Sequence, residues 1–163
     1  MEHDPRTRTI YRKLCTVIPN LQEHLKAGTE HGKSKLYTDG LMDLSYDFLS
    51  EDGEGIYLIA LAHHYEQNGD LVPDPDMEIK VNTRDEVAEA MSFQNAMLYQ
   101  HVGHGEERKE RLQKDLNEFL EQWLDNALAQ GHRIDLSKVK TREDDIDSAR
   151  GEKGRDRETG MER

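Results

Sequence analysis

Residues 42–48, with the sequence MDLSYDF, decide the fold. Their apolar side chains fall at every second position: Met42, Leu44, Tyr46 and Phe48. A period of two is typical of a β-strand that buries one face and leaves the other in water. Asp43, Ser45 and Asp47 occupy the positions between, so the stretch predicts a strand with one buried face and one acidic, solvated face.

The next stretch supplies a pairing partner for this strand. Residues 50–55 (SEDGEG) have the composition of a turn. Residues 56–65 (IYLIALAHHY) are apolar on both faces, which is typical of a strand in the centre of a sheet. The two strands together predict a hairpin.

Further strands follow along the chain. Residues 66–70 contain an Asn-Gly turn, and the sequence PDPD at 73–76 predicts an extended connection outside any central ladder. Residues 77–81 alternate again, and residues 87–102 provide one or two more strands, broken near Gln94-Asn95. We therefore expect an antiparallel sheet of four or five strands.

Helical periodicity flanks this sheet on both sides. Apolar residues between Ile10 and Leu25 recur at spacings of three and four, and Pro19 among them predicts a kinked helix or two short ones, ending at Gly28. A long C-terminal amphipathic helix, ending at Gly131, carries Leu112, Leu116, Phe119, Leu120, Trp123, Leu124 and Leu128 on one face. Two amphipathic helices and a sheet with one apolar face predict an α+β fold in two layers.

The expected domain covers residues 1–132. From Arg133 to Arg163 the chain has balanced charges and few apolar residues without a fixed period, so this segment cannot bury enough surface to offset the entropy of ordering. We expect a disordered charged tail over residues 133–163.

Charge is concentrated in the middle of the chain. The 163 residues carry a formal net charge of −12, and residues 39–89 hold fourteen acids against Lys80 and Arg84. Nucleic acids and anionic membranes bind clustered Lys and Arg, so direct contact with either is not expected. The expected partner is a basic protein.

The chain has the features of a cytoplasmic protein. Its longest apolar stretch, residues 56–62, is seven residues, whereas a membrane span needs roughly 20. The first residues lack an apolar signal region, and the single cysteine, Cys15, cannot form an intrachain disulfide.

Two patterns could carry chemistry. Potential metal ligands are dense between residues 63 and 78: His63, His64, Glu66, Asp70, Asp74, Asp76 and Glu78. Adjacent residues of a strand point to opposite faces, so His63 and His64 cannot both chelate one ion there, and we expect neither a metal nor another cofactor. Asp43 with the Glu78-Ile79-Lys80 run is similar to the metal-dependent nuclease pattern of an Asp and a Glu-x-Lys, although the surrounding residues lack the bases that a DNA-cutting surface needs.

One longer motif resembles a known family. The run from His64 to Leu71 (HYEQNGDL), followed by residues 74–78 (DPDME), resembles an uncharacterised bacterial domain-of-unknown-function family found on conjugative plasmids and integrative elements, with a pattern of the HYYEQNGDLxxDPDM type. Looser agreement continues to the C-terminal helix, so the resemblance covers about residues 41–132. The resemblance implies an accessory protein of mobile DNA, a class that frequently acts on host defence or on transfer machinery.

Together these observations predict a non-enzymatic acidic binding protein. The most concrete hypothesis is an inhibitor of a host defence complex, of the anti-CRISPR or anti-restriction type, that acts as a nucleic-acid (DNA) mimic. The expected binding residues are Glu66, Asp70, Asp74, Asp76, Asp43, Asp47 and Glu78. The alternatives are a metal-dependent hydrolase or nuclease using Asp43, Glu78 and Lys80, and a plain structural or assembly module.

Overall fold

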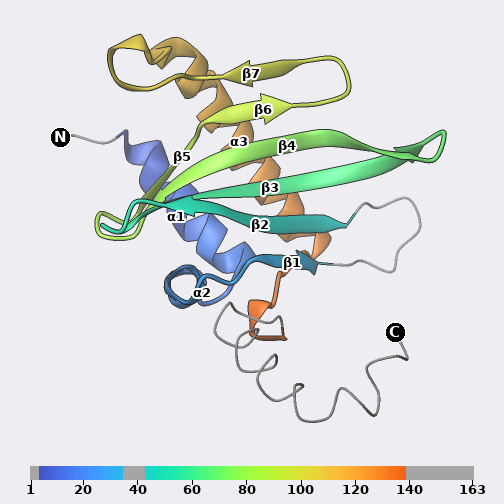
Figure 1. Ribbon diagram of the computed structural model, residues 1–163, viewed down its shortest axis with the longest axis horizontal. Coiled ribbons are helices and arrows are strands. Elements are labelled where there is room, and N and C mark those ends of the chain that lie inside the picture. The colour runs from blue at the N-terminus through green and yellow to red at the C-terminus, as the bar shows by residue number, and fades with distance from the viewer. Residues whose placement is uncertain (1–3, 35–42, 139–163) are drawn as a thin grey trace, which may run out of the picture.

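A computed structural model describes residues 4–34 and 43–138. These residues form seven strands in one antiparallel sheet, with the two longer helices on one face of it (Figure 1). The helices are α1 (Pro5–Val17), α2 (Leu21–Ala27) and α3 (Glu110–Gln130), with short 3-10 turns at Gly105–Glu107 and Leu136–Lys138. The strands are β1 (His31–Ser34), β2 (Leu44–Glu51), β3 (Ile56–Gln67), β4 (Asp70–Asn82), β5 (Val87–Ala90), β6 (Ser92–Gln94) and β7 (Tyr99–His101). The α+β prediction is confirmed.

The order of strands is β1-β2-β3-β4-β6-β7, and β5 pairs with β4 beside β6. The sheet has more strands than the four or five expected. β1 has the sequence HGKS, which shows no apolar alternation, and the region of residues 87–102 divides into three short strands instead of one or two. As expected, this region breaks after Gln94, where Asn95 begins a tight turn.

The N-terminal helical segment is divided at Pro19, as predicted. α1 ends at Val17, and Asn20 adopts a left-handed conformation before α2 begins. Gly28 ends α2 with φ of +72°, a conformation that costs a glycine little because it lacks a Cβ atom. Asp4 begins α1, and its side chain accepts a hydrogen bond from the backbone N–H of Arg6.

The prediction for residues 66–76 was wrong in one respect. The expected turn and loop are part of the long β3–β4 hairpin, whose tip is only Asn68-Gly69. The ladder passes from the Ala62–Asp76 pair to the His64–Pro73 pair, with a register shift between them. Pro75 is accommodated because it lies with Asp74 in this irregularity, where it does not have to donate a ladder hydrogen bond, whereas Pro73 remains in the ladder opposite His64.

The core lies between the sheet and the helices. One face of β2, β3 and β4 buries Tyr46, Leu61 and Met77, which are paired across the three strands and have no exposed surface. From the other side α1 contributes Ile10 and Leu14, and α3 contributes buried residues that include Leu120, Trp123 and Leu124. Among the described residues, no helix covers the opposite face of the sheet, which we call the open face (Figure 1).

The ordered fold continues beyond the expected boundary at residue 132. Ile134 and Leu136 are 0% and 1% exposed and belong to the hydrophobic core, and the backbone N–H of Ile134 donates to the carbonyl of Val17. Two apolar side chains are too few to give a periodic signal, which is why the sequence placed them in the tail. Residues 139–163, the remainder of that tail, lie outside the described residues.

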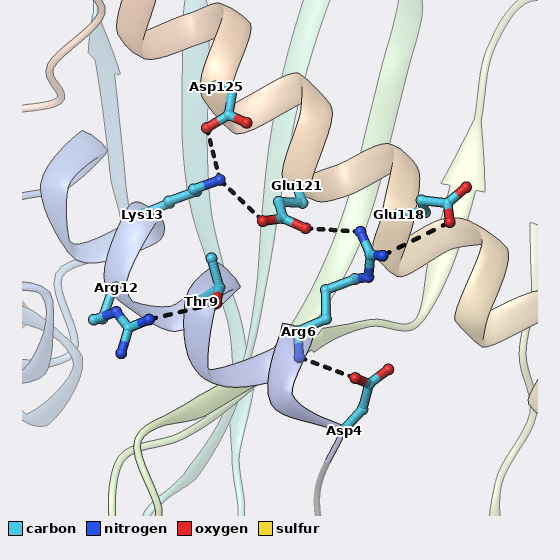
Figure 2. Close-up of polar contacts among 8 residues, drawn as sticks. All are labelled: Asp4, Arg6, Thr9, Arg12, Lys13, Glu118, Glu121 and Asp125. Atoms are coloured by element: carbon cyan, nitrogen blue, oxygen red, sulfur yellow. Dashed lines mark hydrogen bonds and ion pairs between the residues drawn. The ribbon is translucent and has the colours of Figure 1, made fainter.

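Ion pairs join α1 to α3 across the outer surface of the helical layer (Figure 2). Arg6 contacts Glu121 at 2.7 Å and Glu118 at 3.7 Å. Lys13 contacts Glu121 at 3.0 Å and Asp125 at 2.8 Å. The acids of α3 that face α1 are therefore neutralised within the molecule. No helix in the described part of the chain has the length and apolar character of a membrane span.

Candidate functional site: the open face of the sheet

Strand register determines which side chains share the open face. One row of paired residues crosses six strands: Lys33, Ser45, Ala62, Asp76, Gln94 and Tyr99. The next row consists of His31, Asp47, Ala60 and Glu78. Both rows alternate with the buried row that contains Tyr46, so they point away from the helices. Asp47 and Glu78 therefore lie on one face, as the sequence predicted, and Asp76, which was expected in a loop, lies on the same face.

Small residues separate these carboxylates. Ala60 and Ala62 of β3 stand between Asp47 on β2 and the two acids of β4. Neighbouring strands are roughly 4.8 Å apart, so acidic side chains flank a low centre about two strand spacings wide. Ala62 is buried and Ala60 is half-buried, so a bound surface can contact the strand at Ala60 while its cations reach carboxylates on both sides.

Three more predicted acids lie toward the end of the β3–β4 hairpin. Glu66, opposite Leu71, and Asp70, opposite Gln67, are exposed on either side of the tip. Asp74 is exposed in the register irregularity between the tip and Asp76. Glu66 follows the alternation of the open face, whereas Asp70 belongs to the adjacent pair and points to the other face. Asp74 acts electrostatically on the helix-side His63. The hairpin thus displays exposed acids on both of its faces.

Most of these carboxylates have no internal cation. His31 contacts the Asp47 carboxylate at 2.8 Å, and Lys80 contacts Glu89 at 3.2 Å. Among the described residues, five other side chains make no hydrogen bond or ion pair: Glu66, Asp70, Asp74, Asp76 and Glu78. β2, β3 and β4 carry seven acids and one lysine between them, in contrast to the paired charges of the helical layer.

Asp76 shows the electrostatic effect of this arrangement. Partial burial raises the pKa of Asp76 above its ordinary value, and the negative charges of Asp47 and Glu78 raise it further. The nearby His64 acts in the opposite direction, more strongly than either acid but less than burial. The ionised form of Asp76 is therefore under-compensated, and an approaching cation would stabilise it.

The nuclease arrangement is not assembled. Asp43 lies four residues before Asp47, which is in register with Glu78, so Asp43 and Glu78 are separated by roughly 13 Å along the strand direction alone. Two ligands of one ion must both lie within about 2.5 Å of it. Lys80 contacts Glu89, a residue outside the predicted triad.

His63 and His64 point to opposite faces, as predicted. His63 is 8% exposed on the helix side, where its Nδ1 hydrogen-bonds to the backbone carbonyl of Asp43 at 2.9 Å. Its ring contacts the rings of Trp123 and His132, with centroid distances of 5.5 and 5.4 Å. Burial lowers the pKa of both His63 and His132. The described ranges 4–34 and 43–138 contain no group of three or more His, Cys, Asp or Glu residues placed to hold a metal ion.

Comparison with known proteins gives one result that covers most of this structure. Residues 13–133 match the family described as domain of unknown function DUF6908. The chain belongs to the DUF6908 family. No curated protein and no solved structure matches the chain. The prediction that the chain belongs to a domain-of-unknown-function family is thereby confirmed, whereas the match does not bear on the bacterial origin, the plasmid setting or the motif.

The DUF6908 match includes every described strand and α3, and it ends just before the buried residues Ile134 and Leu136. All seven predicted binding residues fall inside the matched segment. The family description contains no activity, so any function of the open face must be argued from its geometry.

Some residues of this face were missed in the sequence. His31 and Lys33 come from β1, whose short sequence gives no strand signal, although their spacing of two already placed them on one face of any strand. Met91 and His104, which were also missed, line two adjoining hollows of about 230 and 410 Å³ together with Lys80, a residue that the sequence had singled out; the larger hollow reaches Gln113 of α3. Leu58 and Ile56 line the smaller one, which offers an apolar recess beside the acidic rows.

Proposed function

We propose that this DUF6908 protein is a non-enzymatic binding protein whose open face and β3–β4 hairpin bind a basic protein partner. The observation that carries the proposal is the set of five carboxylates without an internal partner, on Glu66, Asp70, Asp74, Asp76 and Glu78. Unpaired acids repel one another: burial is the main cause of the raised pKa of Asp76, and the charges of Asp47 and Glu78 add to it while His64 opposes it. A cationic surface would relieve that repulsion.

The arrangement suits recognition because its carboxylates are held by strands. Asp76 and Glu78 are two residues apart on β4, and their backbone is fixed between β3 on one side and β5 and β6 on the other. Groups already held in a fixed arrangement lose little freedom on binding, so more of the interaction energy contributes to affinity. A rigid row of anionic groups is what a mimic of a nucleic-acid backbone requires.

We further propose that the partner is a nucleic-acid-binding defence complex of the CRISPR-effector or restriction type, inhibited in the bacterial cytoplasm by occupation of its basic groove. The motif of residues 64–78 supports the setting, because its resemblance is to a family of conjugative plasmids and integrative elements. The net charge of −12 supports the chemistry, because a groove that holds nucleic acid is lined with Lys and Arg.

Binding of defence complexes to immobilised protein tests the proposal. We would immobilise the full chain and measure association of purified CRISPR effectors and restriction enzymes from a recipient bacterium at low and high salt, together with competition by DNA. The test variant is Asp70→Lys, Asp74→Lys, Asp76→Lys. The matched control is Glu106→Lys, Glu107→Lys, Asp115→Lys, three exposed acids outside the sheet that give the same change of +6 in net charge.

We expect the test variant to lower the association rate by roughly ten-fold or more at low salt, because long-range attraction steers charged partners together. High salt should reduce the difference, and DNA should compete with the wild type. The control variant should bind nearly as the wild type does. Equal binding by the test variant and the wild type at low salt would show that the hairpin acids serve only solubility, and the protein would then be a plain structural module.

A further inference from the structure

The longest uncharged segment of the chain forms one edge of the sheet. Residues 90–105 contain no Asp, Glu, Lys or Arg, in a sequence where 34% of residues are charged. This segment builds β6, β7 and the turn between them, and β7 is the outermost strand on that side (Figure 1). Natural sheets often protect such an edge with charged residues or with proline, and residues 90–105 contain neither; the only protection of this kind is the shortness of β7, three residues.

The outer side of β7 has unused backbone groups. Val102 N–H donates to the Met91 carbonyl, and Asn95 N–H donates to the Leu98 carbonyl, each at 2.9 Å. In an antiparallel ladder, pairs that hydrogen-bond to each other alternate with pairs that do not. Because the Met91–Val102 and Asn95–Leu98 pairs hydrogen-bond, the Ser92–His101 and Gln94–Tyr99 pairs do not, and the N–H and C=O groups of Tyr99 and His101 point away from β6. In the described part of the chain no strand pairs with that side of β7.

Exposed apolar side chains gather at the same edge. Of the six large hydrophobic residues that are exposed in the described ranges, four are here: Met97 (91%), Leu98 (47%), Tyr99 (57%) and Phe119 (42%). Phe119 lies on the helix side and contacts Phe93 of β6, with ring centroids 5.3 Å apart. The turn that presents Met97 and Leu98 is fixed, because the Asn95 side chain accepts hydrogen bonds from both of their backbone N–H groups at 2.9 Å.

We propose that β7 pairs with β7 of a second copy of this chain, in an antiparallel two-fold arrangement centred on Gln100. Tyr99 of each copy then lies opposite His101 of the other, and the outward backbone groups of these residues satisfy one another with four hydrogen bonds. A second copy of the chain is the partner that this edge favours. β7 can pair with itself by two-fold symmetry, and neither copy places a charged residue in the pairing.

Within the row of Tyr99, charge repulsion between the two copies is weak. The acid nearest to the edge in the row of Tyr99 is Asp76, which is separated from β7 by β6. The two copies of Asp76 would be five strand spacings apart, or roughly 24 Å, well beyond the Debye length of about 8 Å in physiological salt. The two-fold axis would be perpendicular to the sheet, so both open faces would lie on the same side of one continuous sheet of fourteen strands, twice the seven of one copy.

The mass of the full chain in solution tests the proposal, and it does not depend on the proposed function because no other partner is present. Sedimentation equilibrium over a concentration series should give twice the monomer mass of 18.9 kDa. Two variants should give the monomer: Tyr99→Pro, which removes an outward N–H, and Met97→Lys with Leu98→Lys, which places charges at the edge. The matched control is Leu71→Lys, which changes a 70% exposed leucine at the tip of the other hairpin and should remain a dimer.

Circular dichroism would confirm that each variant is folded, and the double lysine variant decides the test if Tyr99→Pro does not fold. A wild-type chain that is a monomer throughout the series overturns the proposal. A dimer that persists when Met97→Lys and Leu98→Lys are combined also overturns it, as does a dimer that is lost only with Leu71→Lys.

Discussion

Acidification is expected to destabilise this fold through two buried histidines. His63 and His132 are 8% and 0% exposed, their rings are 5.4 Å apart, and burial lowers the pKa of both. The lowering of the His63 pKa is partly opposed by Asp43 and Asp74. The lowering of the His132 pKa is partly opposed by Asp43. His64 disfavours charge on His63, and His63 disfavours charge on His132. In each case burial is the largest cause, so both rings are neutral in the folded protein near neutral pH.

The sign of the effect follows from proton linkage. A histidine with a lowered folded-state pKa binds fewer protons when folded than when unfolded, so its contribution to stability is present above the unfolded pKa of about 6.5 and is lost as pH falls below it. One such group changes the free energy of unfolding by at most about 1.4 kcal/mol per pH unit. Between about pH 7.5 and about pH 5.5 the ring in the unfolded chain is on average about half protonated, so each group loses at most about 1.4 kcal/mol and two groups at most about 2.8 kcal/mol. That loss corresponds to a fall in melting temperature of roughly 6–11 °C.

Urea unfolding at a series of pH values would measure this loss. Trp123 is the only tryptophan of the chain and contacts the His63 ring at 5.5 Å, so its fluorescence reports on the site itself. The variant His63→Gln, His132→Gln should be less stable at neutral pH and should lose most of the pH dependence in this range. His64→Gln, a neighbour that points to the open face, should retain it. A wild-type stability that is constant or rises as the pH is lowered through this range would refute the reasoning, as would an unchanged slope in the double variant.

Three other predictions follow from the packing and the site. Truncation after Lys138 should change the free energy of unfolding by less than about 0.5 kcal/mol. Truncation after His132 should lower it by about 4 kcal/mol or more, because Ile134 and Leu136 are buried, and chemical denaturation of the two shortened chains would show the difference. Asn117→Ala should destabilise by about 1–3 kcal/mol, since the Asn117 side chain accepts the buried backbone N–H of Ala90 at 2.7 Å, and thermal unfolding would detect it. Mg²⁺, Mn²⁺ and Zn²⁺ should leave the melting temperature unchanged, and a rise that Glu78→Ala abolishes would restore the metal hypothesis.

Local periodicity predicted the elements that bury a regular face. The alternation of residues 44–48 corresponds to the first part of β2, and the apolar spacing that begins at Leu112 corresponds to α3. Segments whose structure depends on distant contacts could not be predicted in the same way. β1 is held by its pairing with β2, and Leu136 packs against Gly32, where a side chain larger than hydrogen would collide with it. Neither interaction leaves a periodic trace in the sequence.

The candidate site was predictable to the extent that it depends on strand alternation. Asp47 and Glu78 share a face because both alternate with residues of the buried row, and that could be inferred without coordinates. The register could not be inferred, because it depends on the irregularities at residues 48–50 of β2 and between Ala62 and His64 of β3. A shift of one residue would have placed Asp47 in the core, so the register is enforced by burial of Tyr46 and Leu61 rather than by the acids themselves.

The distribution of cations explains why the negative charge remains on one side of the molecule. Arg6 and Lys13 are placed by α1 against α3, where they neutralise Glu118, Glu121 and Asp125 (Figure 2). Pairing of these exposed charges adds at most about 1 kcal/mol each to stability, so the same cations could have been placed on the sheet at little cost. The hairpin acids instead have no compensating lysine, and the folded state tolerates a raised pKa at Asp76. Stability differs little between the two arrangements, so stability does not account for the uncompensated charge, which we propose serves the binding of a basic partner.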